Sequence, residues 1–346
     1  MIVRDWYPLS LSYLPPKLVH REKEVEKLLS FLKRPEPGIR PETLILDGPT
    51  GTGKTALVRW VLLRHGLEFA YVSAQMRNVY QMLLELAHQI TGRQVKVGYP
   101  TSQIVRMIEG REGHKIIVID EIDRCQERDP KKVDGLLALL MRMEGSSLIL
   151  ITNKMDWAET FIAPDLEPYI GSRVRLTHYK APELYDILRQ RAELALEPGS
   201  WEDEALRYIA ASVAQTSGSA KEAIELLAKA CKVAGERLTA DAVKGVMREA
   251  EIQEMREVIS SYPLHHKLIL AELVEAGKLK SSELYRRYVD RARRMGIKPL
   301  TKTPFLRILS DLSVDDVISL RKTGSRGSPY MVRLSVPREL LEGMIS

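Results

Sequence analysis

The stretch Gly48-Pro49-Thr50-Gly51-Thr52-Gly53-Lys54-Thr55 decides the fold of this chain. It follows the apolar run 43–46, expected to be a short buried strand, and precedes the run 56–63, expected to be a helix. In this context a G-x-x-x-x-G-K-[ST] match indicates a phosphate-binding loop. The glycines let backbone N–H groups turn inward, and the helix adds the positive end of its dipole. Lys54 is predicted to reach the β and γ phosphates of a nucleotide, and Thr55 to hold Mg²⁺.

A second predicted strand ends in two carboxylates, which is the Walker B pattern. Four apolar residues at 116–119 precede Asp120 and Glu121, and ligands lie at the carboxyl ends of strands in parallel sheets. We expect Asp120 to bind Mg²⁺ through water and Glu121 to polarise the attacking water. The strand 147–153 ends in Asn153, which we expect to contact the γ-phosphate or that water. Carboxylates that only cap a helix, and a turn asparagine, are the alternatives.

The bulk composition is that of a globular protein with ample core. The 346 residues are 45% hydrophobic and 28% charged, and no apolar run approaches the roughly 18–20 residues that span a bilayer. The N-terminus shows no signal-peptide pattern. Cys125 and Cys231 lie far apart without metal-ligand spacing, so we expect free thiols in a reducing compartment. The expected location is cytoplasmic and nucleoid-associated, without a membrane partner.

The pattern of elements changes twice along the chain. Residues 1–180 alternate strands with helices, which predicts an α/β nucleotide-binding domain with a parallel, doubly wound sheet. Residues 181–260 are helical throughout and are expected to form a lid. Residues 261–346 hold three predicted helices, within 264–275, 281–295 and 303–312, and two strands at 316–320 and 330–334, which is typical of a winged helix.

The positive charge is concentrated at the end of the chain. Residues 256–346 hold 17 Lys and Arg against 10 Asp and Glu, which leaves 35 against 36 in residues 1–255. This distribution indicates a nucleic-acid-binding module, and a solvated basic surface is the alternative. We expect a third helix to enter the major groove and a wing to reach the backbone or minor groove. The predicted contacts from this helix and wing are Thr301, Lys302, Thr303, Arg307, Arg321, Lys322, Arg326 and Gly327.

In this order, the motifs and domains resemble the archaeal origin-recognition initiators, AAA+ ATPases related to the eukaryotic origin recognition complex. The more specific marks are His20-Arg21-Glu22 ahead of the glycine-rich loop and the extra helix between the second and third strands. The resemblance implies that this inserted segment, beginning at Arg77, touches DNA. It also implies a nucleotide-contacting pair at the lid, Tyr179 and Arg191, for which a core tyrosine and a surface arginine are the alternative.

The motifs and the resemblance together imply one nucleotide site for ATP or ADP with Mg²⁺. Its expected contacts precede, form and follow the glycine-rich loop and extend into the lid. They are His20, Arg21, Pro49, Thr50, Gly51, Thr52, Gly53, Lys54, Thr55, Ala56, Tyr179, Arg191 and Lys221.

Two departures from the family pattern affect the expected hydrolysis. Where the family carries an arginine that serves a neighbouring subunit's γ-phosphate, this chain has Tyr169. Arg173 is the expected substitute, since the related clamp loaders use a Ser-Arg pair nearby. The lid sensor, usually Gly-Asp-Ala-Arg, ends here in Lys221, which keeps the charge but loses the planar fork. We therefore expect slow or absent turnover by the isolated protein.

The sequence predicts an ATP-binding initiator of DNA replication that recognises origin duplex DNA, with ATP as a conformational switch. A replicative helicase or a paralogous initiator is the expected protein partner. Two alternatives stay open. One is a AAA+ remodeller or clamp-loader-like ATPase whose winged helix docks protein partners, and the other is a nucleotide-gated DNA-binding regulator.

Overall fold

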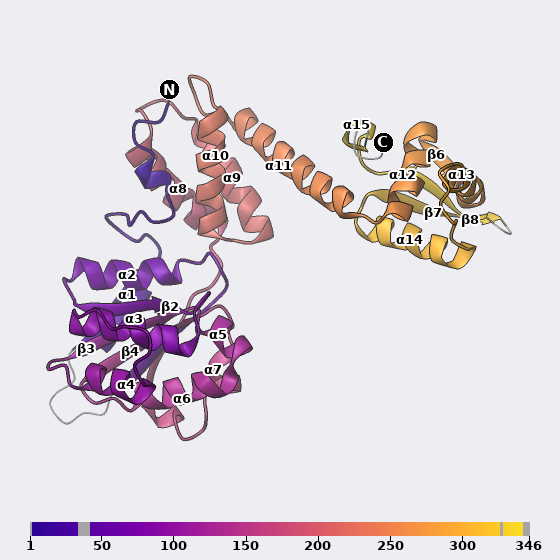
Figure 1. The fold of residues 1–346 in the computed structure, drawn as a ribbon. Coiled ribbons are helices and arrows are strands. Elements are labelled where there is room, and N and C mark those ends of the chain that lie inside the picture. Colours follow the sequence, from indigo (N-terminus) through magenta and orange to yellow (C-terminus); the bar gives the residue numbers. More distant parts are fainter. Residues whose placement is uncertain (1, 34–41, 326–327, 342–346) are drawn as a thin grey trace. The chain divides into compact units, whose positions relative to one another are not determined.

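The computed structural model describes residues 2–33, 42–325 and 328–341. The chain divides into two compact units, Met1–Lys244 and Gly245–Ser346, whose elements are labelled in Figure 1. Across the described ranges, no helix is long and apolar enough to cross a membrane.

A five-stranded parallel sheet forms the centre of the first unit, with strand order β2-β3-β4-β1-β5. Every neighbouring pair in it is parallel, so the expected parallel sheet is confirmed. The strands are β1 (Glu42–Asp47), β2 (Phe69–Ser73), β3 (Lys115–Asp120), β4 (Ser146–Thr152) and β5 (Ile170–Arg175). β3, β4 and β1 are the inner strands, and they are nearly continuous apolar runs because both faces of a parallel sheet are covered.

Alternate residues of each strand enter two separate cores, one on each face of the sheet. On β1, Leu44 and Leu46 pack with α1 (Glu22–Leu32) and α2 (Lys54–Arg64). Ile45, between them, faces the opposite core. That core is built with helices α3 (Val79–Thr91), α4 (Thr101–Glu109) and α6 (Pro130–Met141).

Two short helices of this unit are absent from the sequence prediction, α5 (Ile122–Arg128) and α7 (Trp157–Phe161). α5 begins directly after Glu121, whose backbone is left-handed with φ 57°. For the neighbouring helix the sequence predicts residues 136–143, and α6 begins six residues earlier, at Pro130. Pro130 occupies its first turn and the Asp129 side chain accepts from the backbone N–H of Lys132, which together define a helix start.

The lid helices are α8 (Ala181–Ala195), α9 (Asp203–Thr216), α10 (Ala220–Val233) and the start of α11 (Ala240–Ser261). The N-terminal segment, which contains the 3₁₀ turn η1 (Tyr7–Leu9), runs along α8. The backbone N–H of Arg4 donates to Ala195 O at 2.8 Å, and that of Glu197 donates to Ile2 O at 2.9 Å. Residues 2–4 are thus bound to the end of α8 and pack with the lid.

The second unit contains α12 (Leu264–Ala276), α13 (Ser281–Arg294), α14 (Lys302–Val314) and α15 (Arg338–Leu341). Its antiparallel sheet has the order β6-β8-β7, with β6 (Lys278–Lys280), β7 (Ile318–Ser325) and β8 (Ser328–Leu334). Leu279, Ile318 and Val332 lie on the sheet face that packs into a core with the helices. Three helices and a hairpin confirm the predicted winged helix, to which the structure adds the three-residue strand β6.

Candidate functional site

In the glycine-rich loop between β1 and α2, Gly51 and Gly53 have backbone conformations that favour glycine. Gly51 has φ 81°, and a Cβ there would collide with the hydroxyl of Ser219, which lies in the lid. Gly53 has φ 91° and precedes the first residue of α2. Side chains at these positions would be strained and, at Gly51, would push the lid away. The loop therefore presents backbone to the space beneath the lid.

Lys54 is the buried cation of this loop, with only 6% of its surface exposed. Its ammonium donates to Gly48 O at 2.6 Å and to Pro49 O at 2.8 Å, and Thr52 Oγ1 also donates to Pro49 O. Burial lowers the pKa of Lys54. The negative charge of nearby carboxylates, most of all Asp120, partly offsets this decrease. A desolvated cation gains most from an anionic partner.

Asp120, at the end of β3, receives two hydroxyl hydrogen bonds on one oxygen. Thr55 Oγ1 donates to Asp120 Oδ2 at 2.6 Å, and Tyr71 OH donates to the same atom at 2.7 Å. Burial, followed by the charge of Asp120, raises the pKa of the Tyr71 phenol. Sequence reasoning missed Tyr71, whose place beside Asp120 follows from the pairing of β2 with β3.

The residues that follow β3 and β4 meet at the same edge of the sheet. Asp123, 3% exposed, accepts the backbone N–H of Asn153 at 3.2 Å. Burial raises the pKa of Glu121, and the carboxylates of Asp120 and Asp123 raise it further. The loop after β4 is therefore tied to the start of α5, which follows β3.

Arg21 and Tyr179 form a buried pair that joins the start of α1 to the connection between β5 and the lid. Arg21 Nε donates to Tyr179 OH at 2.8 Å, and its guanidinium lies 4.0 Å from the centre of the tyrosine ring. Arg21 Nη2 also donates to Thr52 O at 3.3 Å and to Thr177 O at 3.0 Å. One guanidinium thus contacts the glycine-rich loop and, through Thr177 and Tyr179, the connection from β5 to the lid.

Arg191 of α8 holds the N-terminal segment. Its Nη1 donates to Pro8 O at 2.7 Å and its Nη2 donates to Tyr13 O at 3.1 Å. Burial lowers the pKa of Arg191 to about 10, and its buried Nε has no hydrogen-bond partner among the described residues. His20, in contrast, pairs with Asp186 at 2.7 Å and is partly exposed.

A cavity of about 360 Å³ lies between the glycine-rich loop, the N-terminal segment and the lid. Most of the predicted nucleotide-site residues line it, and His20, Pro49, Thr52 and Arg173 do not. The predicted residues that line it are Arg21, Thr50, Gly51, Gly53, Lys54, Thr55, Ala56, Asp120, Glu121, Asn153, Tyr179, Arg191 and Lys221. The structure adds Arg59 and the segment Leu11–Pro15, which the sequence did not single out.

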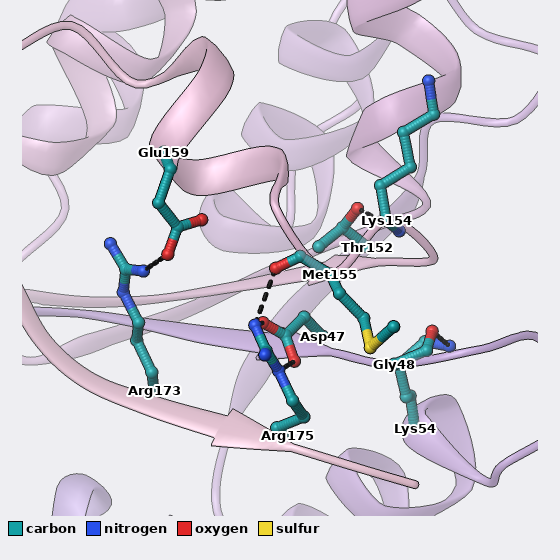
Figure 2. Close-up of polar contacts among 9 residues, drawn as sticks. All are labelled: Asp47, Gly48, Lys54, Thr152, Lys154, Met155, Glu159, Arg173 and Arg175. Carbon is teal, nitrogen blue, oxygen red and sulfur yellow. Dashed lines mark hydrogen bonds and ion pairs between the residues drawn. The ribbon is translucent and has the colours of Figure 1, made fainter. Parts of the chain in front are cut away.

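Two arginines on one face of the edge strand β5 bind different neighbours, as Figure 2 shows. Arg173 forms an ion pair with Glu159 of α7. Arg175 donates two hydrogen bonds, of 2.8 and 2.9 Å, to the carboxylate of Asp47, and a third, of 2.8 Å, to Met155 O. Because Asp47 precedes the glycine-rich loop and Met155 follows Asn153, Arg175 ties both loops to β5.

The predicted DNA-contacting residues of the second unit are exposed where the structure describes them. Thr301 is the residue before α14, and Lys302, Thr303 and Arg307 are in its first two turns. Arg321 and Lys322 are neighbours on β7, so their side chains leave opposite faces of the hairpin. Arg326 and Gly327 lie outside the described residues.

Arg77, in the first unit, lies in the loop ahead of α3. Its guanidinium donates to Ser73 O at 3.2 Å. Arg128 of α5 donates to the carbonyls of Ala74, Gln75 and Arg77, and so fixes the shape of that loop.

Three family models match the chain in sequence. The AAA family (ATPases associated with various cellular activities) matches residues 44–163, the Cdc6 AAA+ ATPase-type lid domain matches 185–251, and the CDC6 C-terminal winged helix domain matches 257–343.

Over nearly its whole length, the chain is similar to ORC1-type DNA replication proteins. The ORC1-type DNA replication protein 1 of Aeropyrum pernix is 31% identical over 100% of this chain and 95% of its own length. The ORC1-type DNA replication protein of Desulfurococcus amylolyticus is 30% identical over 96% of this chain and 91% of its own length. Among solved structures, the Aeropyrum pernix ORC1 protein in complex with DNA matches with a TM-score of 0.66 and 29% identity, covering 100% of this chain and 97% of that one.

Proposed function

The chain belongs to the ORC1-type DNA replication proteins, which are AAA+ ATPases with a Cdc6-type lid and winged helix. We propose that it is an initiator that binds origin duplex DNA and that ATP switches its conformation. The proposed conformational switch rests on the direct contact between the glycine-rich loop and the lid. The Ser219 hydroxyl fills the space in which Gly51 lacks a side chain, and the backbone N–H of Lys221 donates to Gly51 O at 3.4 Å.

The cavity fits a nucleoside triphosphate in chemistry and in size. Its volume of about 360 Å³ lies within the usual range of ligand sites, about 300–1,000 Å³. Lys54 supplies a buried cation where the phosphates of a bound nucleotide meet the loop, and glycine backbone lets them approach closely. Arg191 and the N-terminal segment close the opposite side. These features support ATP and ADP as the ligands.

The Thr55 hydroxyl and the Asp120 carboxylate are the oxygen donors that would hold Mg²⁺ beside the phosphates. Bound there, Mg²⁺ would neutralise charge on the phosphate oxygens. Tyr71 keeps the Asp120 carboxylate oriented through a hydrogen bond independent of Thr55. We expect Glu121 to orient water and Asn153 to contact that water or the terminal phosphate, and the hydrogen bond from Asn153 N–H to Asp123 supports this role.

Switching predicts that duplex affinity depends on the bound nucleotide. We expect a non-hydrolysable ATP analogue and ADP to give dissociation constants that differ by about fivefold or more, the low end of typical coupling energies. Fluorescence anisotropy with a labelled duplex measures both. The Lys54→Ala variant is the control, since it should lose the nucleotide effect and keep the duplex affinity of the nucleotide-free protein. Equal dissociation constants in both nucleotides would refute the switch.

Origin recognition requires sequence preference in addition to affinity. Repeated selection of bound duplexes from a random pool should converge on one motif. A pool that stays random, together with fast ATP turnover, would favour the remodelling ATPase. Convergence on promoter or element-end sequences would favour the regulator.

Slow hydrolysis is a separate expectation that follows from two residues. Tyr169, in place of the family's arginine, is half-buried against the core, and Lys221 offers a single ammonium to the cavity. We expect well under several turnovers per minute without DNA or partner, and an increase of about threefold to tenfold in Lys221→Arg because the planar fork returns. Phosphate release measures both, with Lys229→Arg as the matched lid control. Fast turnover by the wild type would contradict the expectation.

The remaining expectations stay predictions. They are the helicase or paralogous partner, the cytoplasmic, nucleoid-associated location, the contribution of Arg173 to a neighbouring subunit, and the domain limits 1–180, 181–260 and 261–346.

A further inference from the structure

The small sheet of the second unit has one apolar face and one basic face. Leu279, Val332 and Ile318 point to the core and are buried. Their neighbours along each strand point the other way, because side chains alternate. The register pairs Lys278 with Arg333 and Ser319 with Arg333 in one row, and Lys280 with Met331 and Arg321 with Met331 in the next. We name the surface of Lys278, Lys280, Arg321 and Arg333 the outer sheet face.

Within the described ranges of the second unit, the four cations of the outer sheet face have no acidic partner in an ion pair. All four are exposed. Lys278 stands directly opposite Arg333, an arrangement of like charges that destabilises a sheet. Arg338 adds a further cation beside Gly277, next to Lys278. Binding of a polyanion would neutralise these charges and lower the free energy of the protein.

The outer sheet face points away from the helix predicted to read DNA. α14 packs on the apolar side of the sheet, where Phe305, Ile308 and Leu309 enter the core. Lys322 shares that side, since it alternates with Arg321. A duplex held by α14 and Lys322 therefore leaves the outer sheet face free.

The composition of this face favours a phosphate backbone over a protein. Protein interfaces need apolar or aromatic anchors at their centre. The only apolar side chain among the paired positions of this face is Met331, and it is half-buried. A flat set of lysines and arginines without such anchors suits sequence-independent contact with DNA phosphates.

We propose that the outer sheet face binds the backbone of a second duplex segment while α14 holds the first, so that one chain bridges two stretches of DNA. This inference rests on the proposed DNA-binding function, and it concerns a surface to which that function assigns only Arg321.

A bridging assay with the full chain tests the proposal. One duplex is fixed to beads, and a second, fluorescent duplex is captured only if protein links the two. Lys278→Gln with Lys280→Gln should lower capture by about tenfold, since two phosphate contacts are lost, and should leave affinity for a single duplex within about twofold. The matched control, Lys229→Gln with Lys232→Gln on α10, removes the same charge and should change neither.

A second variant separates binding from folding. In Lys278→Glu a carboxylate lies opposite Arg333, so the Tm of this variant should rise. Its capture of the second duplex should fall. A structural role for Lys278 predicts a lower Tm.

Two results would overturn the proposal. The variant of Lys278 and Lys280 could capture as well as the control, or it could lose single-duplex affinity to the same degree as Lys302→Gln with Arg307→Gln. If capture is unchanged in the first variant and abolished in the variant of Lys302 and Arg307, the duplexes are bridged by oligomers through α14. Absence of duplex binding by the wild type would instead refute the proposed function.

Discussion

Lys54→Ala is expected to weaken ATP binding by roughly 30- to 1,000-fold, because truncating one partner of a desolvated charge pair costs about 2–4 kcal/mol. The Lys54 side chain lines the cavity and is almost wholly buried. It is 6% exposed and is held by two loop carbonyls, which keep its ammonium in the loop before any phosphate arrives. The positive charge is therefore preorganised, and its loss is not compensated by a flexible neighbour.

Two measurements check this prediction. Anisotropy of a fluorescent ATP analogue gives the affinity directly. Thermal unfolding gives it indirectly, since a ligand at 100 times its dissociation constant stabilises the folded state by about 2.7 kcal/mol, and this nucleotide-dependent rise in Tm should vanish. Lys131→Ala is the control, because Lys131 is exposed on α6 and far from the loop in sequence. Wild-type affinity in Lys54→Ala would show that the nucleotide is held elsewhere.

The second large effect is expected from three cations of the winged helix. Lys302→Gln, Arg307→Gln and Lys322→Gln together should weaken duplex binding by about 100-fold near 0.1 M salt and lower the slope of log K against log salt by about 3. All three side chains are exposed on the side of the sheet where α14 packs. Anisotropy titrations at several salt concentrations measure both quantities.

The control for this variant removes the same charge from the first unit. Lys131→Gln, Lys229→Gln and Lys232→Gln should reduce affinity by far less and keep the salt slope within about 1 of the wild type. An equal loss in both variants would mean that net charge, and not the winged helix, attracts the duplex. If the variant of Lys302, Arg307 and Lys322 kept its affinity for duplex DNA, the alternative would be favoured in which the winged helix docks protein partners.

The sequence predicts the sheet, the glycine-rich loop and the ends of the strands well, because each depends on residues adjacent in the chain. The alternation of apolar runs with helical patterns identifies a parallel sheet, and Gly51, Gly53 and Lys54 are recognised by spacing alone. The strands 43–46 and 147–153 are found within one residue of β1 and β4. For the exposed edge strand the sequence predicts residues 173–177, three residues after the start of β5, because the burial of β5 alternates and its apolar run is short.

Contacts between distant residues could not be predicted in this way. Tyr71 meets Asp120 only because β2 pairs with β3, and nothing in the local sequence of Tyr71 indicates it. Arg191 was expected at the nucleotide, and the structure shows that its two terminal nitrogens hold backbone carbonyls of the N-terminal segment while its side chain still lines the cavity. The strand β6 has only three residues, too few for a periodic pattern.

The route of residues 2–15 has a consequence for how the protein is made. Leu11–Pro15 line the cavity, and Tyr13 O accepts a hydrogen bond from Arg191 of α8, 178 positions later in the chain. Arg4, before them, donates to the carbonyls of Leu194 and Ala195 of the same helix. During synthesis at the ribosome, the beginning of the chain must wait until most of the first unit has emerged before it can dock. Closing so long a loop costs entropy that shorter contacts avoid, so ATP-binding competence should arise late in folding, after the sheet has formed.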